Sequence, residues 1–123
     1  MAYKLVVSTV LEFPVRFSLL DGEKDRLFTF KVRGNRVDVE AFRKTLGDST
    51  DMLVDALRKF LLGDQLSLKM VDWVGPAALV DDAGQPAPAG PEALAALLQL
   101  DGMTQHVFNA VADANSAKGR LGN

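Results

Sequence analysis

Two runs of alternating apolar and polar residues, separated by a short glycine-containing turn, constrain the fold of this chain more than any other feature. The apolar members of the first run are Phe13, Val15, Phe17 and Leu19, and those of the second are Phe28, Phe30 and Val32. Alternation with a period of two places such side chains on one face of an extended segment. Asp21 and Gly22 form a turn signal between the runs, because glycine adopts the positive φ that tight hairpins need. The pattern predicts an antiparallel hairpin with one buried face and one solvated face.

Two further segments predict extended structure near this hairpin. Residues 4–9 are rich in β-branched residues and predict another strand. Residues 66–70 alternate briefly and predict a short strand or an extended arm that leads toward Trp73. Pro14 has no N–H to donate to a ladder, so we expect it at a strand start or on an edge strand.

After Gly34-Asn35 the apolar spacing changes from two to about 3.6, which is typical of amphipathic helices. Asp38 is expected to cap a first helix that Gly47 ends. Ser49 or Thr50 is expected to cap a second helix that Gly63 ends. The apolar stripes of these two helices are expected to be Val39, Phe42 and Leu46, and then Leu53, Val54, Leu57, Phe60 and Leu61.

A proline-rich stretch over residues 76–91 separates the first two predicted helices from the last two. This composition predicts an extended surface loop with little secondary structure of its own and a tight turn over residues 81–84. Pro91 suits the first turn of a third helix, and Gly102 separates that helix from a fourth. The expected stripes are Leu94, Leu97 and Leu98, and then Met103, Val107, Ala110, Val111 and Ala114; His106 and Phe108 fall off the last stripe.

Together these patterns predict the α+β class, with an N-terminal antiparallel hairpin or small sheet followed by about four helices. A chain of 123 residues can bury one modest core, so we expect a single domain over residues 1–115. Residues 116–123 are expected to form a flexible C-terminal tail. We expect the first two helices to cover the sheet face that bears Phe17 and Phe30, and the last two to pack as a hairpin.

The composition excludes several kinds of chemistry. The chain has no cysteine, which rules out disulfides, zinc–thiolate sites, iron–sulfur clusters and cysteine nucleophiles. His106 is the only histidine, so paired-histidine chemistry is excluded and a histidine-based metal site is not expected. No base is placed against a serine or threonine nucleophile by any recognisable motif. We therefore expect no enzymatic activity, no cofactor and no metal.

Charge and hydropathy argue against nucleic acid and membrane as partners. The net charge of −2 does not favour binding to phosphate backbones. One basic cluster exists, and it is interpreted as the solvated side of the predicted sheet; its members are Lys31, Arg33, Arg36, Arg43 and Lys44. The chain has neither an apolar run long enough to span a bilayer nor the pattern of a signal peptide, so we expect a cytoplasmic protein.

Trp73, the only tryptophan, lies just before the proline-rich loop and outside the periodic elements identified above. Such a side chain either caps the core from the loop side or presents an aromatic anchor to a partner. The stripes of the last two helices hold leucine, methionine, valine and alanine, which suit contacts between helices as well as a core. The sequence leaves both alternatives open.

Three motifs follow one another along most of the chain, from Phe13 to Asn123. They are the hairpin followed by Arg36-x-Asp38, then Val71-x-Trp73-x-Gly75 with Val80-Asp81-Asp82-Ala83-Gly84-x-Pro86-x-Pro88, and then Glu92-x-Leu94-x-x-Leu97-Leu98 with an alanine-rich last helix. In this order they resemble the tail assembly chaperones of long-tailed bacteriophages and prophages. Three positions depart from that family: Ala89-Gly90 stand where it has Phe and Ser or Thr, and Asp82 stands where it has Glu.

The resemblance implies a non-enzymatic role in the cytoplasm of a bacterial host. Such chaperones bind the long helical tape-measure protein, help to recruit tail-tube subunits around it, and are absent from the finished virion. The residues expected to contact a partner come from the Trp–Gly unit, the proline turn and the last two stripes: Trp73, Gly75, Pro86, Pro88, Leu94, Leu98, Met103 and Val107. Self-association is left open.

Two other functions compete with this one. A structural virion component, such as a tail-tube or head–tail joining protein, would persist in purified particles. A small ligand-binding domain would instead show a polar-lined pocket with perturbed ionisable groups.

Overall fold

The structure is a computed structural model that describes residues 6–47 and 53–117. The described residues form three strands and four helices, which confirms the predicted α+β class. In chain order these are β1 (Val10–Asp21), β2 (Lys24–Asn35), α1 (Val39–Gly47), α2 (Leu53–Leu61), β3 (Lys69–Val74), α3 (Pro91–Leu97) and α4 (Met103–Asn115). The expected cap of the second helix at Ser49 or Thr50 and the tail after residue 117 lie outside the described residues.

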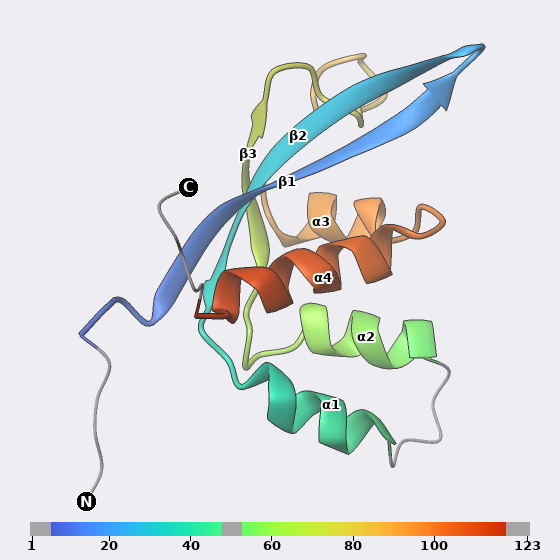
Figure 1. Cartoon of the computed structure of the whole chain (residues 1–123). Helices are drawn as coiled ribbons and strands as arrows, with labels where there is room; N and C mark the ends of the chain where they lie inside the picture. The colour runs from blue at the N-terminus through green and yellow to red at the C-terminus, as the bar shows by residue number, and fades with distance from the viewer. Residues whose placement is uncertain (1–5, 48–52, 118–123) are drawn as a thin grey trace, which may run out of the picture.

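The predicted hairpin is confirmed, and its strands are longer than the sequence pattern indicated. β1 and β2 pair antiparallel over their whole length, with Phe17 opposite Phe28 and Val15 opposite Phe30. The turn between them contains Gly22 at a φ of +67°, a conformation that favours glycine. The inward-facing residues Val15, Phe17, Phe28, Phe30 and Val32 are buried. Leu19 shares their alternation but remains exposed, because the hairpin extends past the helices there (Figure 1).

The N-terminal segment corrects one prediction. Residues 6–9 form no strand, and β1 begins only at Val10; residues 4 and 5 lie outside the described part of the chain. Val6 and Val7 are exposed, so their β-branched side chains have no surface to pack against. The prediction for Pro14 is confirmed, since β1 is an edge strand of the sheet.

The third strand brings Trp73 into the sheet. β3 pairs antiparallel with β2, and Trp73 lies opposite Phe30. A β-bulge leaves Val71 without its own partner, because Val32 pairs with Met70 and Lys31 pairs with Asp72. Trp73 is thus part of a regular strand, which corrects the expectation that it lies outside the periodic elements.

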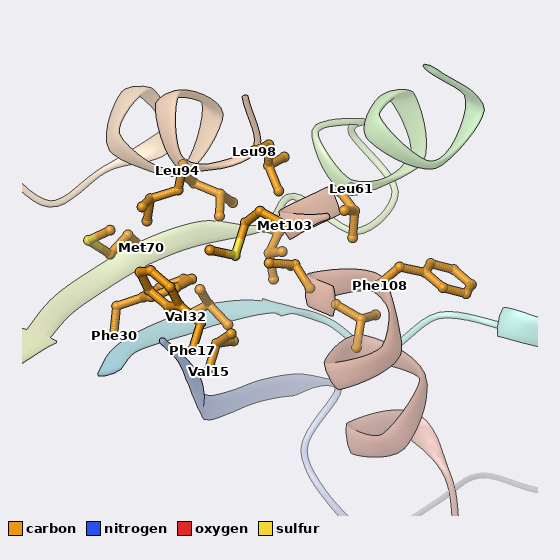
Figure 2. Packing of buried hydrophobic residues seen from close by; sticks show 14 of the residues in the cluster. Val15, Phe17, Phe30, Val32, Leu61, Met70, Leu94, Leu98, Met103 and Phe108 are labelled. Carbon is orange, nitrogen blue, oxygen red and sulfur yellow. The ribbon is translucent and has the colours of Figure 1, made fainter. Parts of the chain in front are cut away.

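The helices cover the sheet in the opposite order to the prediction. α3 packs against β3, while α4 lies between β1 and α2; α1 and α2 lie farther from the sheet (Figure 1). Figure 2 shows Phe30 and Val32 of the sheet facing Leu94 of α3 and Met103 of α4. We attribute this order to the stripes of α3 and α4, which are apolar enough to be buried on the sheet. α3 and α4 pack on the sheet rather than closely against each other, so the expected packing of the last two helices as a hairpin is wrong.

Three phenylalanine rings connect α1, α2 and α4. The Phe42 and Phe60 rings stack at 4.0 Å between centroids, and Phe108 lies 5.7 Å from the first and 6.0 Å from the second. Phe108 is buried, which corrects its assignment to the outside of the α4 stripe. α4 is buried on two sides, so its apolar surface is wider than one stripe. Conversely, Leu53 and Val54 were expected in the α2 stripe and are exposed.

Asp38 caps α1 as predicted, since its Oδ1 accepts a hydrogen bond of 3.0 Å from the N–H of Ala41. We expect Asp38→Ala to lower the free energy of unfolding by about 1 kcal/mol, because the amide loses its acceptor. Asp38→Asn is the control, since its side-chain oxygen keeps the bond and should retain nearly all of that stability. Urea denaturation measures both variants, and equal stability of Asp38→Ala and wild type would contradict the cap.

Candidate partner-binding site

Trp73 connects the sheet to the proline-rich loop. Its indole ring packs edge-to-face on Phe30, with ring centroids 6.2 Å apart and planes at 68°. Its Nε1–H donates a hydrogen bond of 2.9 Å to the carbonyl oxygen of Ala87 in the loop. The side chain is half-buried against the core, and its one polar atom is occupied within the chain. This geometry is that of a core cap, and it holds the loop in one position against β3.

The loop itself is more regular than its composition predicted. The Asp81 carboxylate accepts hydrogen bonds from the N–H groups of Ala83 (2.9 Å) and Gln85 (3.0 Å). The tight turn predicted over residues 81–84 is therefore present, with Gly84 at a φ of +79°. Val80 and Pro86 form an isolated antiparallel bridge on either side of this turn. The loop thus forms a small hairpin-like unit, stabilised by the aspartate and by Trp73.

An open groove of about 520 Å³ runs between this unit and α3; we call it the loop groove. Its lining residues are Leu79, Val80, Ala87, Pro88, Ala89, Gly90, Pro91, Glu92, Ala93 and Ala96. Glu92 is the one charged residue in this lining, and the others are apolar or glycine. Val80 is 61% exposed, which is high for a large apolar side chain. The groove is therefore shallow, mostly apolar and lined by small side chains.

The residues that the sequence singled out for partner contact fall into two groups. Leu94, Leu98 and Val107 are fully buried in the core, so a partner cannot reach them in the folded chain, and Met103 is 4% exposed and packs in the same core. Gly75, Pro86 and Pro88 are exposed, and Trp73 is half-buried beneath the loop.

Only Pro88 of these eight residues lines the loop groove. The sequence reasoning missed Val80 and Ala96, which line the groove from its two sides. One sequence signal could have identified Val80: it is an apolar β-branched residue directly before an aspartate turn, in a proline-rich segment with no helical or strand-like apolar period.

His106, Arg33, Arg43 and Lys44 are exposed, and Lys31 and Arg36 are half-buried. His106 is exposed, and its Nε2 is hydrogen-bonded to the carbonyl oxygen of Arg16 in β1. Arg33 forms an ion pair with Glu12 at 2.8 Å, and Arg43 forms one with Glu40 at 3.0 Å. Side chains of this cluster thus have acidic neighbours on the same surface.

Within residues 6–47 and 53–117, no group of three or more histidine, aspartate or glutamate side chains is arranged to hold a metal ion. No helix in the same ranges is long and apolar enough to cross a membrane. Comparisons with models of protein families, with curated proteins and with solved structures found no match to this chain.

Proposed function

We propose that this chain is a phage or prophage tail assembly chaperone, which binds the tape-measure protein and helps to recruit tail-tube subunits in the bacterial cytoplasm. The proposal rests first on the order of motifs along the chain, above all the Trp73–Gly75 unit followed by the aspartate turn and by Pro86 and Pro88. In this role the chain covers apolar surface on the tape-measure protein until tail-tube subunits take the place of the chain. Such a role needs no catalytic residue.

The loop groove is the observation that carries the proposed mode of binding. A tape-measure protein is a long helix, and the apolar ridge of an amphipathic helix is the complement of a shallow apolar groove. Ala93 and Ala96 allow such a helix to approach α3 closely, while Val80 and Pro88 contact it from the loop side. Because Trp73 and Asp81 hold the loop in place, little ordering is needed on binding.

Ala96→Arg tests this site. Ala96 is exposed on α3, so arginine is tolerated by the fold but projects its charged side chain into the groove. We expect binding to the tape-measure protein of the same genome to weaken at least tenfold, with an unchanged melting temperature. Isothermal titration calorimetry with purified proteins measures the affinity.

Gln99→Arg is the matched control, because Gln99 is exposed just past the end of α3 and does not line the groove. Its affinity should equal that of wild type, within about twofold. Equal affinities of Ala96→Arg and Gln99→Arg for the tape-measure protein would show that the loop groove is not the binding site. Mass spectrometry of purified particles separates the competing function, since a chaperone is absent from them and a virion component is present.

A further inference from the structure

The far end of the hairpin projects beyond the helices as a two-stranded arm, which we define as residues 18–27 (Figure 1). Every residue of the arm is exposed. Three of them are leucines: Leu19 is 37% exposed, Leu20 is 71% and Leu27 is 64%. Exposed leucines along the arm add little to the core of this chain, so their presence there points to an intermolecular contact.

The outer edge of β1 is partly covered at its base and uncovered along the arm. His106 binds the Arg16 carbonyl, so even-numbered residues of β1 direct their backbone groups away from β2. At the base, the Val10 N–H is bonded to Ser8 Oγ at 3.0 Å, and Pro14 has no N–H. Among the described residues, none makes a hydrogen bond to the outward backbone groups of Ser18 and Leu20. An uncovered edge of this kind accepts another strand.

A second open groove, of about 470 Å³, lies beside this uncovered edge; we call it the arm groove. The arm groove is lined by Arg16, Phe17, Ser18, Leu19, Leu27, Leu100, Asp101, Gly102, Met103 and His106. It therefore joins the base of the arm to the start of α4.

We propose that two copies of this chain associate through their arms, with the β1 edges paired antiparallel about Leu19 and each arm tip lying in the arm groove of the other copy. A symmetric pairing uses the same surface on both chains, as a two-fold dimer requires. The surface described above is distinct from the loop groove, so this inference does not depend on the identity of the tape-measure partner.

Two conditions select the pairing register: even-numbered residues of β1 face outward, and the exposed Leu19 side chains of the two copies lie against each other. Ser18 then lies opposite the partner's Leu20, and Leu19 lies against the partner's Leu19 on the inward face. The two exposed leucines cover each other. The same register places the partner's Gly22 opposite Arg16, at the mouth of the arm groove.

The charges at the two ends of this contact are complementary. The turn of the arm holds three acidic residues, Asp21, Glu23 and Asp25, and one basic residue, Lys24. Among the described residues, Asp21 pairs with Arg26 of its own chain, while Glu23 and Arg16 are in no ion pair. The partner's Glu23 lies in the turn one position past its Gly22, so the long Arg16 side chain extends toward it across that glycine, which has no side chain. Charge complementarity therefore favours a second copy over an unrelated strand.

Charge reversal tests the contact. Arg16→Glu and Glu23→Arg each place like charges at both ends of the dimer. We therefore expect the dimer dissociation constant of each variant alone to be at least tenfold higher than that of wild type. A mixture of the two variants restores opposite charges at both ends and should form a heterodimer with near wild-type affinity. Both residues are exposed, and recovery on mixing would exclude misfolding as the cause.

Sedimentation equilibrium of the full chain, from micromolar to hundreds of micromolar, gives the dissociation constants. The contact is small, so we expect a wild-type dimer of micromolar or weaker affinity. A wild-type chain that stays monomeric over this range overturns the proposal. A dimer that the two reversals leave unchanged, or that mixing the variants fails to restore, overturns the arm contact as well.

Discussion

Phe30→Ala is expected to lower the free energy of unfolding by about 3–5 kcal/mol, which is a large part of the stability of a domain this size. Phe30 is fully buried in the central strand, opposite Val15 on one side and Trp73 on the other. Its ring lies 5.9 Å from that of Phe17 and 6.2 Å from that of Trp73. Alanine leaves a cavity that two neighbouring strands and the helices above them cannot close.

Denaturant unfolding followed by Trp73 fluorescence measures this loss, at protein concentrations low enough to keep the chain monomeric. Leu27→Ala is the matched control, because Leu27 is a large apolar residue of the same strand with its side chain 64% exposed. We expect that variant to stay within about 0.5 kcal/mol of wild type. A loss below about 1 kcal/mol for Phe30→Ala would contradict the central position of this ring in the core.

Trp73→Ala is expected to cost about 2–3 kcal/mol, somewhat less than truncation of a fully buried aromatic side chain, because Trp73 is half-buried. The variant loses both the packing on Phe30 and the hydrogen bond to Ala87. Trp73→Phe keeps most of the packing and loses only the hydrogen bond, so it should cost about 1 kcal/mol. Circular dichroism follows both transitions, since the fluorescent residue is removed.

These two variants separate the roles that the sequence left open for Trp73. A cap of the core predicts that stability falls in the order wild type, Trp73→Phe, Trp73→Ala. An anchor for a partner predicts instead that binding falls while the melting temperature hardly changes. An unchanged melting temperature for Trp73→Ala would show that the indole does not hold the loop.

Local features of this fold were predictable from the sequence because they depend on neighbouring residues. The hairpin follows from strict alternation around Gly22, and the start of α1 follows from the side chain of Asp38. Pro91 similarly begins α3 where it was expected. In each case the structure-forming interaction spans only a few residues of the chain.

The order of the layers was not predictable in the same way. Nothing in the spacing of Leu94 or Val107 says whether its helix packs on the sheet or on another helix. Phe108 shows the same problem, because a helix that is buried on two sides has no single stripe. The prediction that α1 and α2 cover the sheet was therefore wrong, because α3 and α4 pack on the sheet instead.

The candidate site was only partly predictable for a related reason. The helical spacing of apolar residues selected Leu94 and Val107, which suit a core and a partner contact equally well. In the structure both are buried in the core. The loop groove depends on the hydrogen bond between Trp73 and Ala87, which lie fourteen positions apart. The residue types of Trp73 and Ala87 do not reveal that they are hydrogen-bonded. That Val80 and Ala96 line one groove was therefore not predictable from the sequence.

Hydrogen–deuterium exchange of this chain, with and without saturating tape-measure protein, would locate the proposed binding surface. We expect slower exchange of backbone amides within residues 79–96, which include the loop and most of α3, and unchanged exchange in the arm at residues 18–27. The buried amides of α4 serve as an internal reference for global stability. Formation of a complex with no protection in residues 79–96, or no complex at all, would contradict the proposed chaperone site.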